Sequence, residues 1–259
     1  MFISGIVSVT FKNKTPDEII SLCVENGLRA IEWSENSHVA AGDVDTCRVL
    51  GEKTVSNGLK VAAYGSYYRC ESETDAASDF KPSLEAAIAM GAPVIRIWAG
   101  TKGSEDCDDD YFSLVAKNAA TAAEMAEKHG IKVAFEWHRN TLTDTNESAM
   151  RLLEMANHPN LGSLWQPTPE IPFEQRANGI KTLGERLAHL HVYSWDDERK
   201  RHPFDDEGFF DKWRCYFSAV NKQTDCYSLM EFVMGDTDEQ FVHDAAALNR
   251  LLVEVNGSK

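Results

Sequence analysis

Short apolar segments recur along the chain, and each follows a glycine or asparagine that ends an amphipathic stretch. Five copies of this pattern read ENG-LRAIEW, SNG-LKVAAYG, AMG-APVIRIWAG, KHG-IKVAFEWH and HPN-LGSLWQP. Their marker residues stand 31, 33, 39 and 30 positions apart and are Gly27, Gly58, Gly91, Gly130 and Asn160. Glycine after the last turn of a helix adopts a left-handed conformation without steric cost. Each copy is therefore predicted to be a helix that turns back into a strand.

The stretches between these apolar segments have the spacing of amphipathic helices. Thr15 and Glu18 match a capping box, and Pro16 between them suits the first position of a helix. Near the end of the chain, apolar residues at steps of three and four predict one buried helical face: Phe241, Ala245, Leu248, Leu252 and Val255.

Eight strands are predicted from this reading, near 2–9 and over 28–33, 59–64, 93–99, 131–137, 161–166, 188–194 and 227–233. Their interiors, such as VIRIW and KVAF, are largely apolar with β-branched residues, which is typical of parallel strands covered by helices. Eight alternating units without a linker predict a single (β/α)8 TIM barrel domain over residues 1–259. An open doubly wound sheet is the alternative, but no glycine-rich phosphate motif follows the first strand.

Charge and composition narrow the class of partner. The chain carries 41 acidic and 26 basic residues, a net charge of −15, so nucleic acid and anionic membranes are unfavourable partners. Its six cysteines lack the CxxC spacing of a zinc knuckle and indicate no disulfide framework. The first residues carry no leader-like pattern, and no stretch has the length of a membrane span, so we expect a cytoplasmic protein. The sequence leaves open whether the chain forms a homo-oligomer.

Ionisable and amide side chains gather where the predicted strands end, which is where barrel enzymes hold their catalytic groups. The fifth to eighth strands end in Glu136, Gln166, His191 and Glu231. Such side chains are costly to bury in apolar strands unless they bind something. Three oxygen donors and one imidazole suit a divalent ion, Mn²⁺, Mg²⁺ or Co²⁺, with Zn²⁺ also compatible.

The chain resembles the xylose-isomerase-like superfamily of sugar phosphate isomerases and epimerases. The resemblance runs from GLRAIEW through APVIRIWAG, IKVAFEWHRNTLTDT and LAHLHVYSWDD to YSLMEFV, which is essentially the whole chain. It implies a metal held by Glu136, Gln166, His191 and Glu231, with Glu136 and Glu231 as the acid/base pair. Gln166 departs from the family pattern, in which an aspartate is usual. A glutamine can bind a cation through its carbonyl oxygen but supplies no charge.

Further residues at the predicted barrel mouth are candidates for contact with substrate: Glu32, His38, Tyr64, Trp98, His138, Arg199 and His202. Trp98 and Tyr64 offer aromatic walls at strand ends, and His138 begins a polar loop. Two further residues receive structural interpretations. Arg96 is expected to pair with a carboxylate inside the barrel, and His189 to be an interior histidine that supports the site.

These features together predict an enzyme that moves a proton next to the carbonyl of a small sugar or polyol-derived ketone. A divalent ion would stabilise the enediolate charge, and two glutamates would carry the proton. The same groups would eliminate water from a substrate with a suitably placed hydroxyl, so an inosose-dehydratase-like lyase is the alternative. A sugar-binding barrel that has lost its metal is a second alternative. A class-II AP endonuclease would need more histidine ligands and a basic groove, which the sequence lacks.

Overall fold

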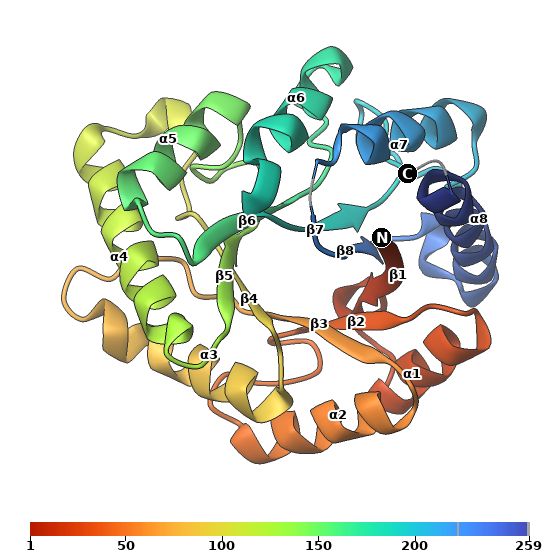
Figure 1. Ribbon diagram of the computed structural model, residues 1–259, viewed down its shortest axis with the longest axis horizontal. Helices are drawn as coiled ribbons and strands as arrows, with labels where there is room; N and C mark the ends of the chain where they lie inside the picture. Colours follow the sequence, from red (N-terminus) through yellow and green to blue (C-terminus); the bar gives the residue numbers. More distant parts are fainter. Residues whose placement is uncertain (222, 258–259) are drawn as a thin grey trace.

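The computed structural model describes residues 1–221 and 223–257, and within them eight parallel strands close into one barrel. The strands are β1 (Phe2–Val7), β2 (Ala30–Ser34), β3 (Lys60–Gly65), β4 (Val94–Ile97), β5 (Lys132–Phe135), β6 (Leu161–Trp165), β7 (Leu187–Val192) and β8 (Cys226–Met230). The barrel closes where β1 pairs with β8, with Phe2 beside Cys226 and Ile6 beside Met230. The predicted single (β/α)8 barrel is confirmed (Figure 1).

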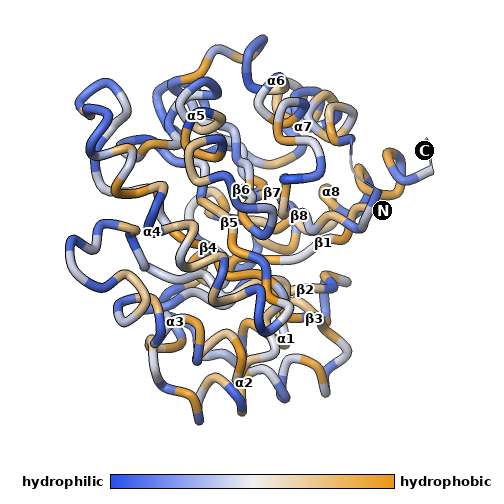
Figure 2. The backbone as a smooth tube through the Cα atoms, turned by 60° about the vertical axis from the view of Figure 1, so that its left-hand side comes forward, coloured by the Kyte–Doolittle hydropathy of each residue, from blue (hydrophilic) through white to orange (hydrophobic). Residues whose placement is uncertain are grey.

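Eight helices surround this barrel in chain order (Figure 1). They are α1 (Pro16–Glu25), α2 (Val44–Ser56), α3 (Ala76–Met90), α4 (Asp109–Glu127), α5 (Asn146–Ala156), α6 (Phe173–Leu183), α7 (Glu207–Ala219) and α8 (Asp238–Gly257). Hydrophobic residues follow the strands and the inward faces of the helices (Figure 2). The predicted apolar face of α8 is buried as a whole, which confirms the periodicity.

The predicted helix ends are mostly confirmed. Thr15 and Glu18 form the capping box at the start of α1. The four predicted glycine markers all have positive φ, between 68° and 79°. The asparagine marker was placed three residues late: α5 ends at Asn157, which takes the left-handed conformation. Asn160 instead donates side-chain hydrogen bonds to the carbonyl oxygens of Ala123 and Ile131.

Several strands stop earlier than predicted at their carboxyl ends. Ser8 and Val9, expected to continue the first strand, instead begin a short 3-10 helix (Ser8–Phe11). Trp98, expected inside the fourth strand, donates its backbone N–H to Tyr68 in the loop after β3. Phe232, expected inside the eighth strand, has a φ of 58° that ends the extended backbone. Apolar sequence therefore continues past the ladder and into the loops that line the mouth.

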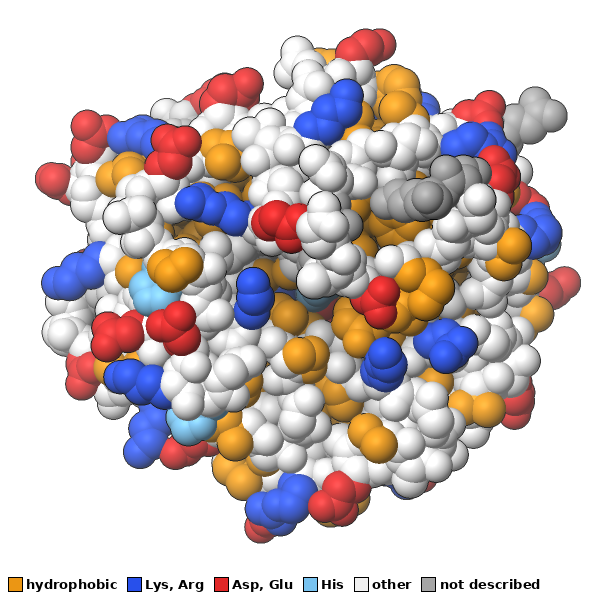
Figure 3. Space-filling model, viewed as in Figure 1, with side chains coloured by type: hydrophobic (Ala, Val, Ile, Leu, Met, Phe, Trp, Pro, Cys, Tyr) orange, Lys and Arg blue, Asp and Glu red, His pale blue; other side chains and the backbone are white. Residues whose placement is uncertain are grey.

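The surface agrees with the charge pattern of the sequence. On the face in Figure 3, acidic and basic side chains are interspersed and form no continuous basic patch. In the part of the chain that the structure describes, no helix combines the length and apolarity needed to cross a membrane.

Gly51 lets α2 pack closely on the end of α3, and this contact yields a test of the fold. A Cβ at position 51 would overlap the backbone carbonyl of Met90. We expect Gly51→Ala to lower the free energy of unfolding by about 1–3 kcal/mol, because overpacking outweighs the better helix propensity of alanine. Gly208→Ala in α7 is the matched control, since the nearest atom to its added Cβ would be 3.9 Å away. Urea unfolding of both variants is the measurement, and an unchanged Gly51→Ala protein would contradict the tight contact.

Candidate active site and metal centre

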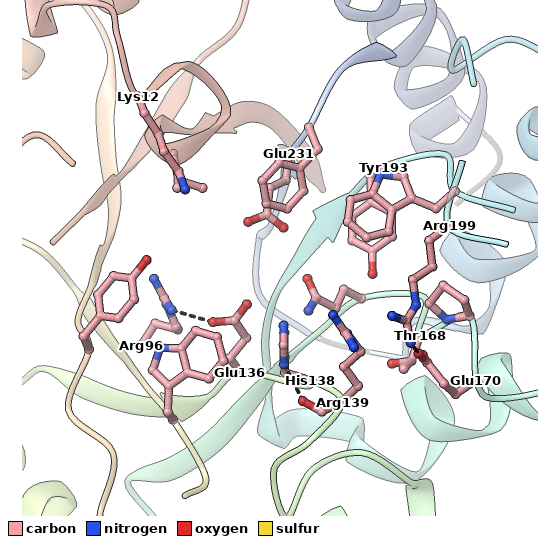
Figure 4. A pocket seen from close by; sticks show the side chains of 17 residues that line it. Lys12, Arg96, Glu136, His138, Arg139, Thr168, Glu170, Tyr193, Arg199 and Glu231 are labelled. Atoms are coloured by element: carbon pink, nitrogen blue, oxygen red, sulfur yellow. Dashed lines mark hydrogen bonds and ion pairs between the residues drawn. The ribbon is translucent and has the colours of Figure 1, made fainter. Parts of the chain in front are cut away.

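A cavity of about 150 Å³ opens at the carboxyl ends of the strands (Figure 4). Its charged and amide lining includes Arg96, Glu136, His138, Gln166, Arg199 and Glu231. Glu136, Gln166 and Glu231 occupy the same relative position, each being the first residue after its strand. Because parallel strands end at one edge of the barrel, this shared position brings side chains of β5, β6 and β8 to the same cavity.

Two carboxylates that line this cavity lie close to the buried imidazole of His191, which is not itself a lining residue. Donor atoms of Glu136, His191 and Glu231 all lie within 4.8 Å of one another. The Nδ1 atom of His191 is 3.5 Å from a carboxylate oxygen of Glu231. All three side chains are almost completely buried. Such a cluster can hold a divalent cation, because a cation would offset the repulsion between two desolvated carboxylates.

The amide of Gln166 is oriented so that its oxygen has no hydrogen-bond partner among the described residues. Its Nε2 donates a 2.7 Å hydrogen bond to the backbone carbonyl of Trp137. A carbonyl only accepts, so the amide nitrogen must face Trp137 and the oxygen must face elsewhere. That oxygen, Oε1, is buried without a hydrogen-bond partner among the described residues. An unpartnered buried acceptor is costly, by about 1–3 kcal/mol, and is therefore suited to a bound cation.

His191 is held from below by a buried carboxylate. Its Nε2 is 3.0 Å from Glu32, which also lies 2.9 Å from Nε2 of His189. A proton on Nε2 that bonds Glu32 leaves Nδ1 as the atom that faces Glu231 and a cation. Burial alone would lower the pKa of His191, but the nearby charges of Glu32 and Glu231 raise it to about 10. Burial would raise the pKa of Glu32, and the two histidines hold it well below its usual range.

Arg96 of β4 links this lower layer to the cavity. Its guanidinium lies 2.5 Å from Glu136 and 3.4 Å from Glu32, so the predicted pairing with a barrel carboxylate is confirmed. Burial opposes the charge of Arg96, but Glu136 and Glu32 raise its pKa. The guanidinium also lies 5.4 Å from the ring centre of Trp98. Gly65 provides the space, because a Cβ there would be 2.7 Å from Glu32 and 2.8 Å from Arg96.

Comparison with known proteins assigns the fold to a family. Residues 20–251 match the family model described as "Xylose isomerase-like TIM barrel". The chain belongs to this family. The family resemblance inferred from the sequence is thereby confirmed.

Individual relatives of this xylose isomerase-like barrel are distant. It is 27% identical over 157 residues to a 3-dehydroshikimate dehydratase of Bacillus anthracis, covering 56% of this chain and 53% of that relative. The match thus spans about half of the curated relative's length. D-Psicose 3-epimerase with D-tagatose from Clostridium cellulolyticum H10 superposes with a TM-score of 0.76 at 14% identity, covering 98% and 99% of the two chains. The IOLI protein with a binding zinc atom gives 0.73 at 14% identity, covering 98% and 97%. At these identities the superpositions show a shared fold.

Three predicted substrate contacts of the barrel line the cavity: Trp98, His138 and Arg199. The rings of Trp98 and His138 meet edge to face, with their centres 4.7 Å apart. Arg199 forms an ion pair with Glu170 at the mouth (Figure 4). These side chains are thus placed where a substrate would meet them, and their roles remain predictions.

Glu32 and Tyr64 do not line the cavity, which corrects their placement as substrate contacts. Glu32 points inward but lies below the cavity, because β2 continues for two residues after it. It holds the histidines instead. Tyr64 is fully buried and points away from the barrel interior, where its hydroxyl donates a 3.0 Å hydrogen bond to Glu35.

His38 and His202 also lie outside the cavity lining. The ring nitrogens of His38 are 3.0 Å from the Ser8 hydroxyl and 3.2 Å from the Lys14 carbonyl, so the ring ties the loop after β2 to the loop after β1. His202 pairs with Asp196 within the loop after β7, at 2.8 Å. Both histidines therefore brace loops.

Sequence reasoning gave no substrate role to several further lining residues, among them Lys12, Tyr67, Arg139, Thr168 and Tyr193. Each lies one to five residues after the end of a strand. Proximity to a strand end was thus the available signal. Many loop residues that face solvent share this proximity, so it does not distinguish the residues that line the cavity.

The ion pairs of Arg96 give a stability test of this site. Arg96→Met keeps most of the side-chain volume but leaves the buried carboxylate of Glu136 without its 2.5 Å partner and removes one of the cations beside Glu32. We expect the free energy of unfolding to fall by about 3–5 kcal/mol, the usual cost of removing one partner of a buried pair. Arg214→Met removes an arginine that pairs with Asp211 and Glu254 near the surface, so it should change stability much less. Equal effects of the two substitutions in urea unfolding would show that the buried network does not carry this energy.

Proposed function

We propose that this chain is a metal-dependent isomerase or epimerase that moves a proton next to the carbonyl group of a small sugar or polyol-derived ketone. The observation that carries the proposal is the convergence of two buried carboxylates, Glu136 and Glu231, on one cavity together with His191 and the unpartnered amide oxygen of Gln166. The likeness to an epimerase fold is consistent with it.

The four residues Glu136, Gln166, His191 and Glu231 would hold the ion. Three oxygen donors and one nitrogen suit Mn²⁺, Mg²⁺ or Co²⁺, with Zn²⁺ also compatible. When bound, such an ion supplies Lewis-acid stabilisation of negative charge that develops on substrate oxygens. Gln166 makes the set less anionic than one with a third carboxylate, so the ion would keep more of its own charge for the substrate.

The proton transfers fall to the two glutamates. Arg96 donates a hydrogen bond to Oε2 of Glu136, which fixes the orientation of this carboxylate while it takes the proton from the carbon next to the carbonyl. Glu231 enters the same cavity from a different strand, β8, and can return a proton from its own direction (Figure 4). Trp98 and His138 form an aromatic wall that limits the water beside the reacting carbon.

Elimination of water is the second candidate reaction. The relative named 3-dehydroshikimate dehydratase favours it, since it matches part of this chain in sequence. The first step would be the same removal of a proton by a glutamate. The outcome then depends on whether the substrate carries a hydroxyl that can leave, because a protonated glutamate can donate to that hydroxyl.

Metal binding gives the first test. After chelation, the protein should bind about one Mn²⁺ per chain in titration calorimetry. Gln166→Leu removes the amide oxygen at similar size and should weaken binding by about 10- to 100-fold, the range for loss of groups that support a metal site. Gln223→Leu, on the exposed segment before β8, is the control. Unchanged affinity in Gln166→Leu would remove this amide from the ligand set, and no binding by the unaltered protein would favour the metal-free sugar-binding alternative.

Proton transfer gives the second test. The Mg²⁺-loaded protein is incubated in D₂O with D-psicose, D-tagatose, D-fructose or 3-dehydroshikimate, and deuterium next to the carbonyl is followed by NMR. We expect Glu136→Gln and Glu231→Gln to slow exchange by at least about 10²- to 10⁴-fold, the usual contribution of a general base. Glu35→Gln is the control, because Glu35 is a buried glutamate that does not line the cavity.

The products of the same incubation separate the two reactions. Deuterated epimer or isomer supports the first candidate, and loss of one water from the product mass supports the second. Near-normal exchange in either glutamine variant would contradict the assignment of that glutamate.

A further inference from the structure

A second and larger cavity adjoins the proposed active site. Its volume is about 520 Å³, against about 150 Å³ for the first. It lies between the loop after β1, which supplies Asn13 and Lys14, and the loops after β7 and β8, which supply Arg201 and Asp236. Both cavities are lined by Val9, Lys12 and Phe232, so the two spaces are neighbours across these side chains.

The sizes of the two cavities suggest that each binds a different part of the substrate. Small-molecule sites usually measure about 300–1,000 Å³, so the first cavity is small for a whole ligand and the second falls within the range. The first has room for the reacting carbons beside the glutamates. A larger substrate can extend past Val9, Lys12 and Phe232 into the second cavity, which adjoins these side chains.

Phe232 is held at this boundary in a strained backbone conformation. Its φ is 58°, which bulky residues rarely adopt and which is energetically unfavourable. Its backbone N–H donates to the hydroxyl of Thr10 at 3.3 Å. The ring packs on Trp195, with centres 5.4 Å apart, and the guanidinium of Arg201 lies 5.2 Å from the ring centre. These contacts therefore fix an aromatic ring between the cavities, directly after Glu231.

The charges around the second cavity compensate one another. Lys14 pairs with Asp238 at 2.8 Å, and Arg201 pairs with Asp236. Glu18 accepts hydrogen bonds from the backbone and the hydroxyl of Thr15. The lining thus presents an aromatic ring beside charged groups whose formal charges sum to zero, since three cations (Lys12, Lys14, Arg201) face three carboxylates (Glu18, Asp236, Asp238). An aromatic face next to hydrogen-bonding groups suits an uncharged ring that bears hydroxyl groups, because its C–H face packs on the aromatic and its hydroxyls replace water.

We propose that this second cavity binds a second sugar ring, so that the substrate is a ketose carrying a glycosyl group. The inference rests on the proposed function for the reacting ring. It adds that a second sugar ring is attached to the reacting ring. Phe232 separates the two subsites, and its backbone N–H and side chain fix their relative position. No additional chemical step is involved.

The test compares one monosaccharide with disaccharides that contain it. D-Fructose is titrated against turanose, maltulose and palatinose, in which glucose is joined to different oxygens of fructose. Binding to the Mg²⁺-loaded protein is measured by calorimetry. We expect at least one disaccharide to bind about tenfold more tightly than D-fructose, the effect of one further aromatic contact.

Asn13 supplies the matched variants, because it lines the second cavity and not the first. Asn13→Trp should fill the second cavity, remove the tenfold advantage of the disaccharide and leave D-fructose binding unchanged. Asn13→Ala should retain the advantage. The proposal is overturned if none of the disaccharides binds more tightly than D-fructose, or if Asn13→Trp leaves their advantage intact.

A metal-free measurement separates this inference from the proposed reaction. Methyl α-D-glucopyranoside offers only the second ring, and its binding to chelated protein needs neither metal nor proton transfer. Binding that Asn13→Trp abolishes supports the subsite even if no ketose is turned over. Absence of binding, together with equal affinities in the calorimetry, rejects the subsite even if D-fructose is a substrate.

Discussion

The buried contact of Arg96 with Glu136 and Glu32 is the constraint on which the rest of the site depends. One guanidinium lies between two carboxylates in the barrel interior, and one of these carboxylates also binds two imidazoles. None of these charges would be tolerated alone at such depth. Each therefore fixes the position of the next, from the interior up to the floor of the cavity.

This chain of contacts positions the groups that would bind metal and move protons. Glu136 is aligned by Arg96, and His191 is aligned by Glu32. Gln166 is aligned by a backbone carbonyl of the same barrel rim. The orientation of the functional atoms thus comes from rigid strands and their immediate neighbours. The loops contribute the walls, which can differ between relatives while the reacting groups stay in place.

The sequence was sufficient for the fold and for the convergence of the strand-end residues. Helix-ending glycines at regular steps imply repeated helix–strand units, and closure of the eight predicted strands brings residues such as Glu136 and Glu231 to one edge. Depth was harder to predict, because strand alternation tells which face a residue takes but not how far it lies from the mouth. Glu32 was therefore predicted to lie nearer to the barrel mouth than it does. The contacts of His38 and Lys12 depend on loop conformations, which local sequence patterns determine only weakly.

The same network also depends on Gly65. It has no functional group, yet the absence of its side chain leaves room for the carboxylate of Glu32 and the guanidinium of Arg96. Any other residue at this position would displace both charges and, through them, the groups above. In a saturation-mutagenesis map of activity, position 65 would therefore tolerate as little variation as the reacting glutamates. The space that glycine leaves there would be as sensitive to substitution as a functional side chain.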